Sequence, residues 1–268
     1  MEVKVALITG GSSGIGAATA KILANAGITV YAGSRRGTVP FEHPGIKAVK
    51  MDVNDDAAVL EAAQSIVKAE GRLDAVVCNA GAGIYGPIEG TTDQEARYQF
   101  ETCCFGVLKT IQACLPVFRS QGFGRIITVS SVMGVLQLPY QGLYSAAKAA
   151  LLSLSQSLSM ELAGTGIECC CVLPGDVATG FTAARKFTLA AQAENSPYKE
   201  GMKKNLAKIE KDELGGMAPE VIGKAILRQL GKKHMAVRVI PRIDYKLFGL
   251  LVRILPAKTV LRVIRLLY

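Results

Sequence analysis

The chain has 268 residues, of which 50% are apolar and 20% are charged, and its net charge is +9. This apolar content is enough for a large buried core and excludes an intrinsically disordered protein. The positive charge is concentrated in residues 201–268, which hold 15 Lys and Arg against 5 Asp and Glu, whereas residues 1–200 carry a net charge of −1.

The first residues give no sign of a targeting segment. Residues 1–8 include Glu2 and Lys4 and lead directly into a glycine-rich turn, so we expect no signal peptide. No run of about 18 uncharged apolar residues occurs, which predicts no membrane-spanning helix. The seven cysteines lack C-x-x-C spacing, and we interpret them as small buried apolar residues in a reducing compartment. We therefore expect a cytoplasmic protein and no metal site.

Short apolar runs alternate with helical patterns along the chain. Runs rich in Val and Ile predict buried parallel strands, whereas apolar residues three and four apart predict helices. The predicted strands are Val3–Thr9, Ile28–Ala32, Ile46–Met51, Leu73–Cys78, Gly124–Val129, Gly166–Leu173 and Ala236–Ile240. The predicted helices are Ala17–Asn25, Ala57–Ala69, Asp93–Ser120, Gln141–Ala163 and Pro219–Leu230. This alternation indicates right-handed crossovers, so the fold class is α/β: a single domain over residues 1–244, with a Rossmann-type doubly wound parallel sheet flanked by helices.

A glycine-rich turn follows the first predicted strand, where such sheets bind ligands. Glycines let the backbone approach a pyrophosphate, and the free N–H groups of the next helix face the phosphates. A plain turn without a ligand is the alternative. The candidate cofactor-binding residues of this turn are Gly10, Ser12, Ser13, Gly14, Ile15 and Gly16.

Further motifs follow the later strands. Asn79-Ala80-Gly81 follows the strand that ends at Cys78, and Ser131 lies thirteen residues before a Y-x-x-x-K motif formed by Tyr144 and Lys148. The last motif is Pro174-Gly175-Asp176-Val177-Ala178-Thr179. In this order, the motifs resemble the classical short-chain dehydrogenase/reductase family, in its NADP-preferring, hydroxysteroid or retinol dehydrogenase-like form.

The resemblance implies a nicotinamide dinucleotide cofactor and further residues that contact it. Asp52 is implied to contact the adenine edge of the cofactor, and Val53 next to it is also implied to bind the cofactor. An ordinary turn role for Asp52 stays open. The other implied contacts are Asn79, Ala80, Gly81, Tyr144, Lys148, Pro174, Gly175, Val177 and Thr179.

The end of the second predicted strand indicates which cofactor is used. An acidic residue there would bind the ribose hydroxyls of NAD(H) and repel a 2′-phosphate. Ser34 occupies this position, and Arg35 and Arg36 follow it. A guanidinium group can hold a phosphate with two hydrogen bonds, so we predict NADP(H). The alternative is that these arginines are ordinary surface residues.

Tyr144 and Lys148 are four residues apart in a predicted helix and therefore share one face. A free tyrosine has a pKa of about 10, and a nearby ammonium group lowers it. The resemblance implies that Tyr144 is the acid/base on the substrate oxygen, that Ser131 donates a hydrogen bond to the same oxygen, and that Lys148 also holds the nicotinamide ribose. The expected reaction interconverts a carbonyl and an alcohol.

One position departs from the family pattern. The family usually has an asparagine three residues before a glycine in the helix after the fourth strand, and here Cys103 stands before Gly106. That asparagine anchors a helix distortion and a water linked to the active-site lysine. A thiol is a weaker hydrogen-bonding group, so the proton relay is expected to differ. The only histidines, His43 and His234, leave little basis for a Cys103 nucleophile or a Ser-His-Asp hydrolase.

In the resembling family, the segment corresponding to residues 181–216 forms a substrate lid. The pocket candidates are largely apolar and include no arginine pair for a small carboxylate: Val132, Met133, Leu136, Leu138, Tyr140, Phe181, Phe187, Leu189 and Tyr198. We predict a steroid-, retinoid- or lipid-like ketone or aldehyde as substrate. Three alternatives stay open: an unrelated small carbonyl as substrate, a 3-oxoacyl thioester reductase, and a non-catalytic regulatory protein that binds the cofactor.

Residues 245–268 form a basic, amphipathic C-terminal extension, which Pro256 divides in two. In the second piece, Lys258, Arg262 and Arg265 lie opposite Val260, Leu261, Ile264 and Leu267. Such a segment lies on a membrane surface, covers the pocket or packs against another subunit. Nucleic acid is not expected, because no recognition motif accompanies the charge. We expect a homodimer or homotetramer.

Overall fold

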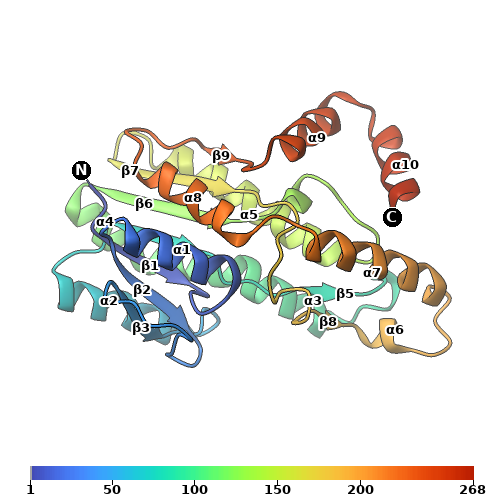
Figure 1. The fold of residues 1–268 in the computed structure, drawn as a ribbon, viewed down its shortest axis with the longest axis horizontal. Coiled ribbons are helices and arrows are strands. Elements are labelled where there is room, and N and C mark those ends of the chain that lie inside the picture. The colour runs from blue at the N-terminus through green and yellow to red at the C-terminus, as the bar shows by residue number, and fades with distance from the viewer. Residues whose placement is uncertain (1) are drawn as a thin grey trace.

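The computed structural model describes residues 2–268, apart from the side chains of Phe248 and Arg253. The strands of the main sheet are β1 (Val5–Thr9), β2 (Thr29–Ser34), β3 (Ile46–Lys50), β4 (Ala75–Cys78), β6 (Gly124–Val129), β7 (Ile167–Val172) and β9 (Arg238–Val239). All pair in parallel, in the order β3-β2-β1-β4-β6-β7-β9, and helices flank the sheet (Figure 1). The predicted single-domain, doubly wound α/β fold is confirmed.

Five long helices cover the two faces of the sheet. Helices α1 (Gly14–Asn25) and α8 (Pro219–Leu230) pack together on one face, and α2 (Asp56–Glu70), α4 (Gly106–Gln121) and α5 (Gly142–Glu161) cover the other. Local sequence sets their ends. In α2, for example, the Asp55 side chain accepts hydrogen bonds from two N–H groups of the first turn, and Gly71, with φ of 70°, ends the helix.

The strand order reverses beside β1. The chain first runs outward through β2 and β3, and then returns to the other side of β1 with β4. In register, Ile8 of β1 lies between Ala32 of β2 and Val77 of β4. The carboxyl ends of β1 and β4 therefore frame the crevice in which such sheets bind ligands.

The prediction of one continuous α-helix over Asp93–Ser120 is wrong. The structure divides it into α3 (Asp93–Phe100), a π-helical turn η2 (Glu101–Phe105), and α4. A π turn adds one residue to the helical repeat, so the apolar pattern on either side remains helical and conceals it. Cys103 lies in this turn.

The region after β7 is more ordered than its mixed sequence suggested. Strand β8 (Lys186–Phe187) pairs with β5 (Ile84–Tyr85), and α6 (Leu189–Gln192) and α7 (Lys199–Leu214) follow. Asn205 is fully buried on the inner face of α7, where its Oδ1 accepts a hydrogen bond from the Tyr85 hydroxyl at 3.0 Å. A polar residue in the buried face interrupts the apolar spacing, which explains why α7 was not predicted. Two 3₁₀ turns, η1 (Ile88–Gly90) and η3 (Val132–Gly134), complete the connections near the site.

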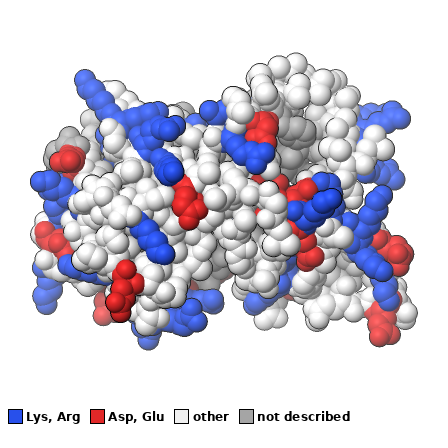
Figure 2. All heavy atoms as spheres, in the orientation of Figure 1, with Lys and Arg blue, Asp and Glu red and all other residues white. Residues whose placement is uncertain are grey.

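Two helices follow the last strand and lie beyond the sheet, above α7 in Figure 1. These are α9 (Ile243–Ile254) and α10 (Ala257–Leu267), separated near Pro256 as the sequence predicts. The Tyr245 hydroxyl of α9 donates to Asp176 Oδ2 at 2.5 Å, and the Tyr268 hydroxyl donates to Asp212 Oδ2 of α7 at 3.1 Å. Among the described residues, no helix is long and apolar enough to cross a membrane. In Figure 2 the region of α9 shows white side chains together with one group of blue and red, and blue side chains lie beside α10.

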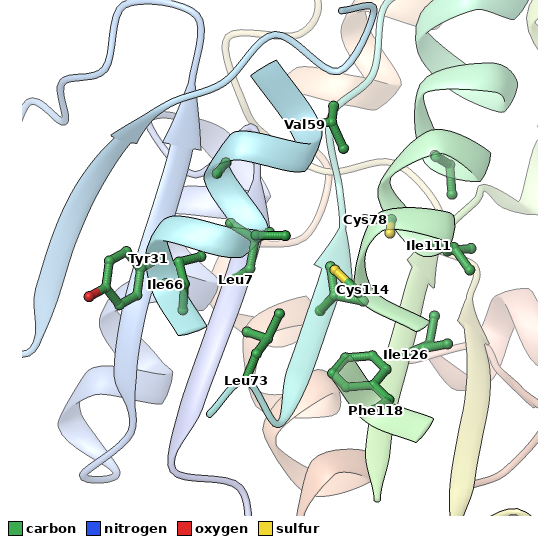
Figure 3. Close-up of a cluster of buried hydrophobic side chains, with 14 of the residues drawn as sticks. Leu7, Tyr31, Val59, Ile66, Leu73, Cys78, Ile111, Cys114, Phe118 and Ile126 are labelled. Atoms are coloured by element: carbon green, nitrogen blue, oxygen red, sulfur yellow. The ribbon is translucent and has the colours of Figure 1, made fainter. Parts of the chain in front are cut away.

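The core consists of two main apolar layers, one on each face of the sheet. The layer of Figure 3 includes Leu7 of β1, Ile66 of α2 and Phe118 of α4. Cys78 and Cys114 belong to the same layer, and all seven cysteines are buried and free of disulfides. Burial raises the pKa of Cys78, and it raises the pKa of Cys114 to about 12, so these thiols stay protonated. Their interpretation as small apolar residues is confirmed.

Candidate active site

The glycine turn after β1 leaves the first turn of α1 open to an anion. Gly10 and Gly14 have φ of 65° and 51°, which side chains rarely adopt. A Cβ atom at Gly16 would lie 2.2 Å from the Gly10 carbonyl oxygen, so the close approach requires glycine. Ser13 is the N-cap of α1, but its side chain does not bond to the first N–H groups of the helix. These features fit the pyrophosphate of a dinucleotide.

The Asn79 side chain supports the glycine turn from behind. Its Nδ2 donates to the carbonyl oxygens of Thr9 and Gly10 at 3.0 and 3.3 Å. The Thr9 hydroxyl oxygen in turn accepts from the N–H groups of Asn79 and Ala80, both at 3.0 Å. Within the Asn79-Ala80-Gly81 motif, Asn79 is therefore a positioning residue for the turn. A Cβ atom at Gly81 would lie 3.8 Å from Lys148 Nζ, which places Gly81 beside the candidate catalytic residues.

Two arginines follow the end of β2 at the ligand-binding edge of the sheet. Ser34 is buried, and its hydroxyl donates to the Thr38 carbonyl oxygen at 3.0 Å, so this side chain shapes the loop. Arg35 and Arg36 are exposed directly after it. The edge thus presents positive charge where an acidic residue would repel a phosphate.

Asp52 and Val53 follow β3 and have local partners. Asp52 Oδ1 accepts a hydrogen bond from the Asn54 N–H group at 3.0 Å, which is the turn role that the sequence left open. Val53 is buried and lies against Gly106 at the start of α4. The two residues are so close that a Cβ atom at Gly106 would lie 2.8 Å from Val53 Cγ2.

The structure brings Ser131, Tyr144 and Lys148 together. Tyr144 and Lys148 lie one turn apart on α5, with Lys148 Nζ 5.8 Å from the centroid of the Tyr144 ring. Ser131 follows β6 as the N-cap of η3, and its Oγ accepts from the Met133 N–H group at 3.1 Å. Ser131 follows the carboxyl end of β6, and Lys148 bonds to Val129 at that end. Gly81, in the motif whose Asn79 supports the glycine turn, lies beside Lys148.

Lys148 is buried and held in place by the sheet. Its Nζ donates to the Val129 carbonyl oxygen at 2.9 Å. Burial lowers the pKa of Lys148, but the neighbouring Cys103 and Tyr144 outweigh that effect, and the net pKa is raised. The side chain therefore remains an ammonium group that faces Tyr144.

The pKa of Tyr144 is raised, contrary to the lowering expected from the sequence. Burial raises it most, whereas the Lys148 ammonium and hydrogen bonding with the Ser131 hydroxyl both lower it. The expected lowering by Lys148 is therefore present, but desolvation of the phenolate outweighs it. At neutral pH the phenol carries its proton, which is the form that can protonate a carbonyl oxygen.

Cys103 anchors the π turn through its thiol. Its Sγ donates to the Ala82 carbonyl oxygen at 3.2 Å and accepts from the Ala82 N–H group at 3.3 Å. The buried Gln99, one helical turn earlier, donates from Nε2 to Cys103 Sγ at 3.1 Å and to the Ala82 oxygen at 2.9 Å. The helix is thus distorted at this position, and a thiol and an amide share the contacts that hold the π turn. Gln99 was not identified from the sequence as a residue of the site. Its position four residues before Cys103, and therefore on the same helix face, was the only signal in the sequence.

The segment after β7 closes over the site. The Pro174 carbonyl oxygen accepts from the Val132 N–H group at 2.8 Å, and a Cβ atom at Gly14 would lie 3.3 Å from Thr179 Cβ. Val177 forms a β-bridge with Met217. The segment therefore joins the Ser131 loop to the glycine turn.

Aromatic residues lie against both ends of this segment. The Phe181 ring lies 5.7 Å from the Tyr144 ring, so the predicted lid contacts the candidate acid/base. At the other end, Tyr245 of α9 covers Gly175, where a Cβ atom would lie 2.2 Å from its ring. Sequence reasoning missed Tyr245, because nothing in the pattern joins residues 70 positions apart.

Fold and site together agree with comparisons against known proteins. Residues 4–189 match the short chain dehydrogenase family. The chain belongs to this family of oxidoreductases. A 3-ketodihydrosphingosine reductase of Bacteroides thetaiotaomicron is 38% identical over 239 residues, which are 89% of this chain and 87% of that protein.

Two solved structures support the same assignment. A short-chain dehydrogenase from Streptomyces avermitilis is 31% identical with a TM-score of 0.80, and the match covers 92% of this chain and 91% of that one. A short chain dehydrogenase from Burkholderia cenocepacia, solved in complex with NADP, is 26% identical with a TM-score of 0.73 and coverage of 94% and 93%.

Proposed function

We propose that this short-chain dehydrogenase uses NADP(H) to interconvert a ketone and a secondary alcohol on a long-chain, lipid-like substrate. The observation that carries the proposal is the placement of Tyr144, Lys148 and Ser131 beside the glycine turn. Tyr144 carries its proton at neutral pH, and Lys148 Nζ lies 5.8 Å from its ring.

The proposed chemistry follows from these three side chains. NADPH, when bound, supplies the hydride. Ser131 donates a hydrogen bond to the carbonyl oxygen and fixes its position. Tyr144 gives its proton to this oxygen in reduction and removes the proton from the alcohol in oxidation. Lys148, fixed by its bond to the Val129 oxygen, stabilises the phenolate that reduction leaves behind.

The residues after β2 support NADP(H) over NAD(H). Arg35 and Arg36 are exposed at the end of the strand, and Ser34 stands where an acidic residue would repel the 2′-phosphate.

The surroundings of Tyr144 support an apolar substrate. Phe181 of the lid segment lies 5.7 Å from the Tyr144 ring. The segment also supplies Phe187, which lies 5.7 Å from the Tyr85 ring. The Bacteroides thetaiotaomicron relative is named for the reduction of a ketone on a long-chain amino alcohol. This observation favours a lipid-like ketone over steroids and retinoids within the apolar class that the sequence predicts.

The proposal is tested by NADPH oxidation with a panel of carbonyls. The panel contains 3-ketodihydrosphingosine, a steroid ketone, retinal, a short ketone and a 3-oxoacyl thioester, each with NADPH and with NADH. We expect the highest kcat/KM for the long-chain ketone with NADPH. A preference for the thioester would make the protein a 3-oxoacyl thioester reductase. NADPH binding without turnover of any carbonyl would favour the non-catalytic alternative.

A further inference from the structure

Helix α9 exposes an apolar stripe on its outer face. Its members recur at helical spacing and are 49–69% exposed: Ile243, Leu247, Leu250, Leu251 and Ile254. They occupy about 100° of the helix circumference, whereas Tyr245 and Val252 lie on the opposite, partly buried face. A surface helix of a water-soluble domain normally turns such a stripe inward. Here the inward face is anchored by Tyr245, and the stripe faces outward.

Helix α10 adds further exposed apolar side chains and positive charge. Val260 and Ile264 are buried, and further apolar side chains remain exposed beside them: Leu261, Val263, Leu266 and Leu267. The side of the helix opposite the buried Val260 and Ile264 carries three basic residues, all exposed, between Leu261 and Leu266: Lys258, Arg262 and Arg265. A group of exposed apolar side chains as large as the α9 stripe marks a contact site.

The charge of this region selects one kind of partner. Residues 241–268 contain six Lys and Arg and a single acidic residue, Asp244, which is paired with Arg242. In Figure 2 blue side chains lie beside α10. A second copy of the chain would bring the same positive charges face to face in a two-fold contact, whereas an anionic lipid surface would neutralise them.

We propose that α9 and α10 dock this protein on an anionic lipid bilayer, with the α9 stripe inserted into the interface. The two helices have 12 and 11 residues, which correspond to lengths of roughly 18 and 16 Å, well short of a hydrocarbon core of about 30 Å. They therefore lie in the plane of the interface, where apolar burial and attraction to lipid headgroups add together.

The docking surface is joined to the candidate active site by direct bonds. Tyr245 contacts Gly175 and bonds to Asp176 directly after β7. At the other end, the Tyr268 carbonyl oxygen accepts from Asn205 Nδ2 of α7 at 3.4 Å. Docking thus holds the lid side of the site near the membrane. Bilayer binding does not depend on the proposed function. The idea that the docked protein receives a lipid-like substrate from the membrane does rest on it.

Co-sedimentation of the full chain with vesicles tests the proposal. The vesicles contain phosphatidylcholine alone or phosphatidylcholine with phosphatidylglycerol, each at low and high salt. We expect binding to the anionic vesicles that weakens with salt. Leu247→Glu with Leu251→Glu removes two exposed stripe residues, and it should reduce binding by roughly tenfold or more. Met160→Glu with Val221→Glu, at exposed positions of α5 and α8, is the matched control and should leave binding unchanged.

A second pair of variants tests the charge. Lys258→Gln with Arg262→Gln and Arg265→Gln should weaken binding to anionic vesicles by about fivefold for each charge removed. Lys4→Gln with Lys68→Gln and Arg119→Gln removes three exposed charges elsewhere and should have little effect. Equal sedimentation of the parent and both docking variants would overturn the proposal. The proposal would also be overturned if the parent bound no vesicle and was a dimer, while the variant with Leu247→Glu and Leu251→Glu was a monomer. The stripe would then be a contact between copies. Turnover of a water-soluble ketone, measured in parallel, separates these outcomes from failure of the proposed function.

Discussion

Gln99 Nε2 donates a hydrogen bond to Cys103 Sγ at 3.1 Å, one helical turn along the chain. Both side chains also bond to the Ala82 carbonyl oxygen, at 2.9 and 3.2 Å, in the loop that follows β4. The π turn that contains Cys103 is therefore fixed to the loop beside the candidate active site.

Cys103→Asn should keep or improve turnover. The amide restores the family's usual group and is a stronger hydrogen-bonding partner for Ala82 than the thiol. Steady-state kcat and KM of this variant and the parent provide the measurement. Strong inactivation in a folded variant would mean that the site depends on the thiol.

Gln99→Leu should lower the free energy of unfolding by about 1–3 kcal/mol, because it leaves the buried Ile84 N–H group without its acceptor. Chemical denaturation measures the change, and Gln112→Leu on the exposed side of α4 serves as the control. Equal stabilities of the two variants would contradict the role assigned to Gln99.

Arg35→Ala should weaken NADPH binding by roughly tenfold or more, since it removes a charge-assisted contact to the 2′-phosphate. NADH lacks this phosphate, so its affinity should barely change. Titration of both cofactors against parent and variant makes each protein its own control. A native preference for NADH, or equal losses for both cofactors, would show that the assignment is wrong.

The pH profile of alcohol oxidation should respond to the charge of Lys148. Burial raises the pKa of Tyr144 and the Lys148 ammonium lowers it. Oxidation needs the phenolate, so its rate should rise with pH toward the pKa of Tyr144. Lys148→Met removes the lowering influence, and the rising part of the profile should move to higher pH. Lys148→Arg keeps a positive charge and should move the rising part of the profile less. Identical profiles for the Met variant and the parent would contradict the influence of the Lys148 charge on the pKa of Tyr144.

Much of the fold was predictable because local patterns determine it. The strands around β1 are short apolar runs bounded by glycines, and the glycine turn identifies the switch in strand order. Tyr144 and Lys148 could be placed on one face from their spacing alone, and Ser131 from its position after β6.

The remaining features depend on contacts between distant parts of the chain. Tyr245 covers Gly175 from a separate helix, and Asn205 of α7 is buried because it meets the Tyr85 hydroxyl. The raised pKa of Tyr144 depends on burial by surrounding elements, whereas the sequence shows only the neighbouring lysine. Such effects of tertiary packing have no local sequence pattern.

The central claim is that Tyr144 transfers the proton, and Tyr144→Phe tests it most directly. The measurement is turnover of the best carbonyl from the panel, together with NADPH affinity by titration, for the parent, Tyr144→Phe and the control Tyr98→Phe on α3. Because only the phenolic hydroxyl is lost, we predict that Tyr144→Phe abolishes turnover, binds NADPH nearly as well as the parent, and contrasts with an active control. Turnover of Tyr144→Phe within about tenfold of the parent would contradict the account, since acid/base catalysis contributes roughly 10²–10⁴-fold.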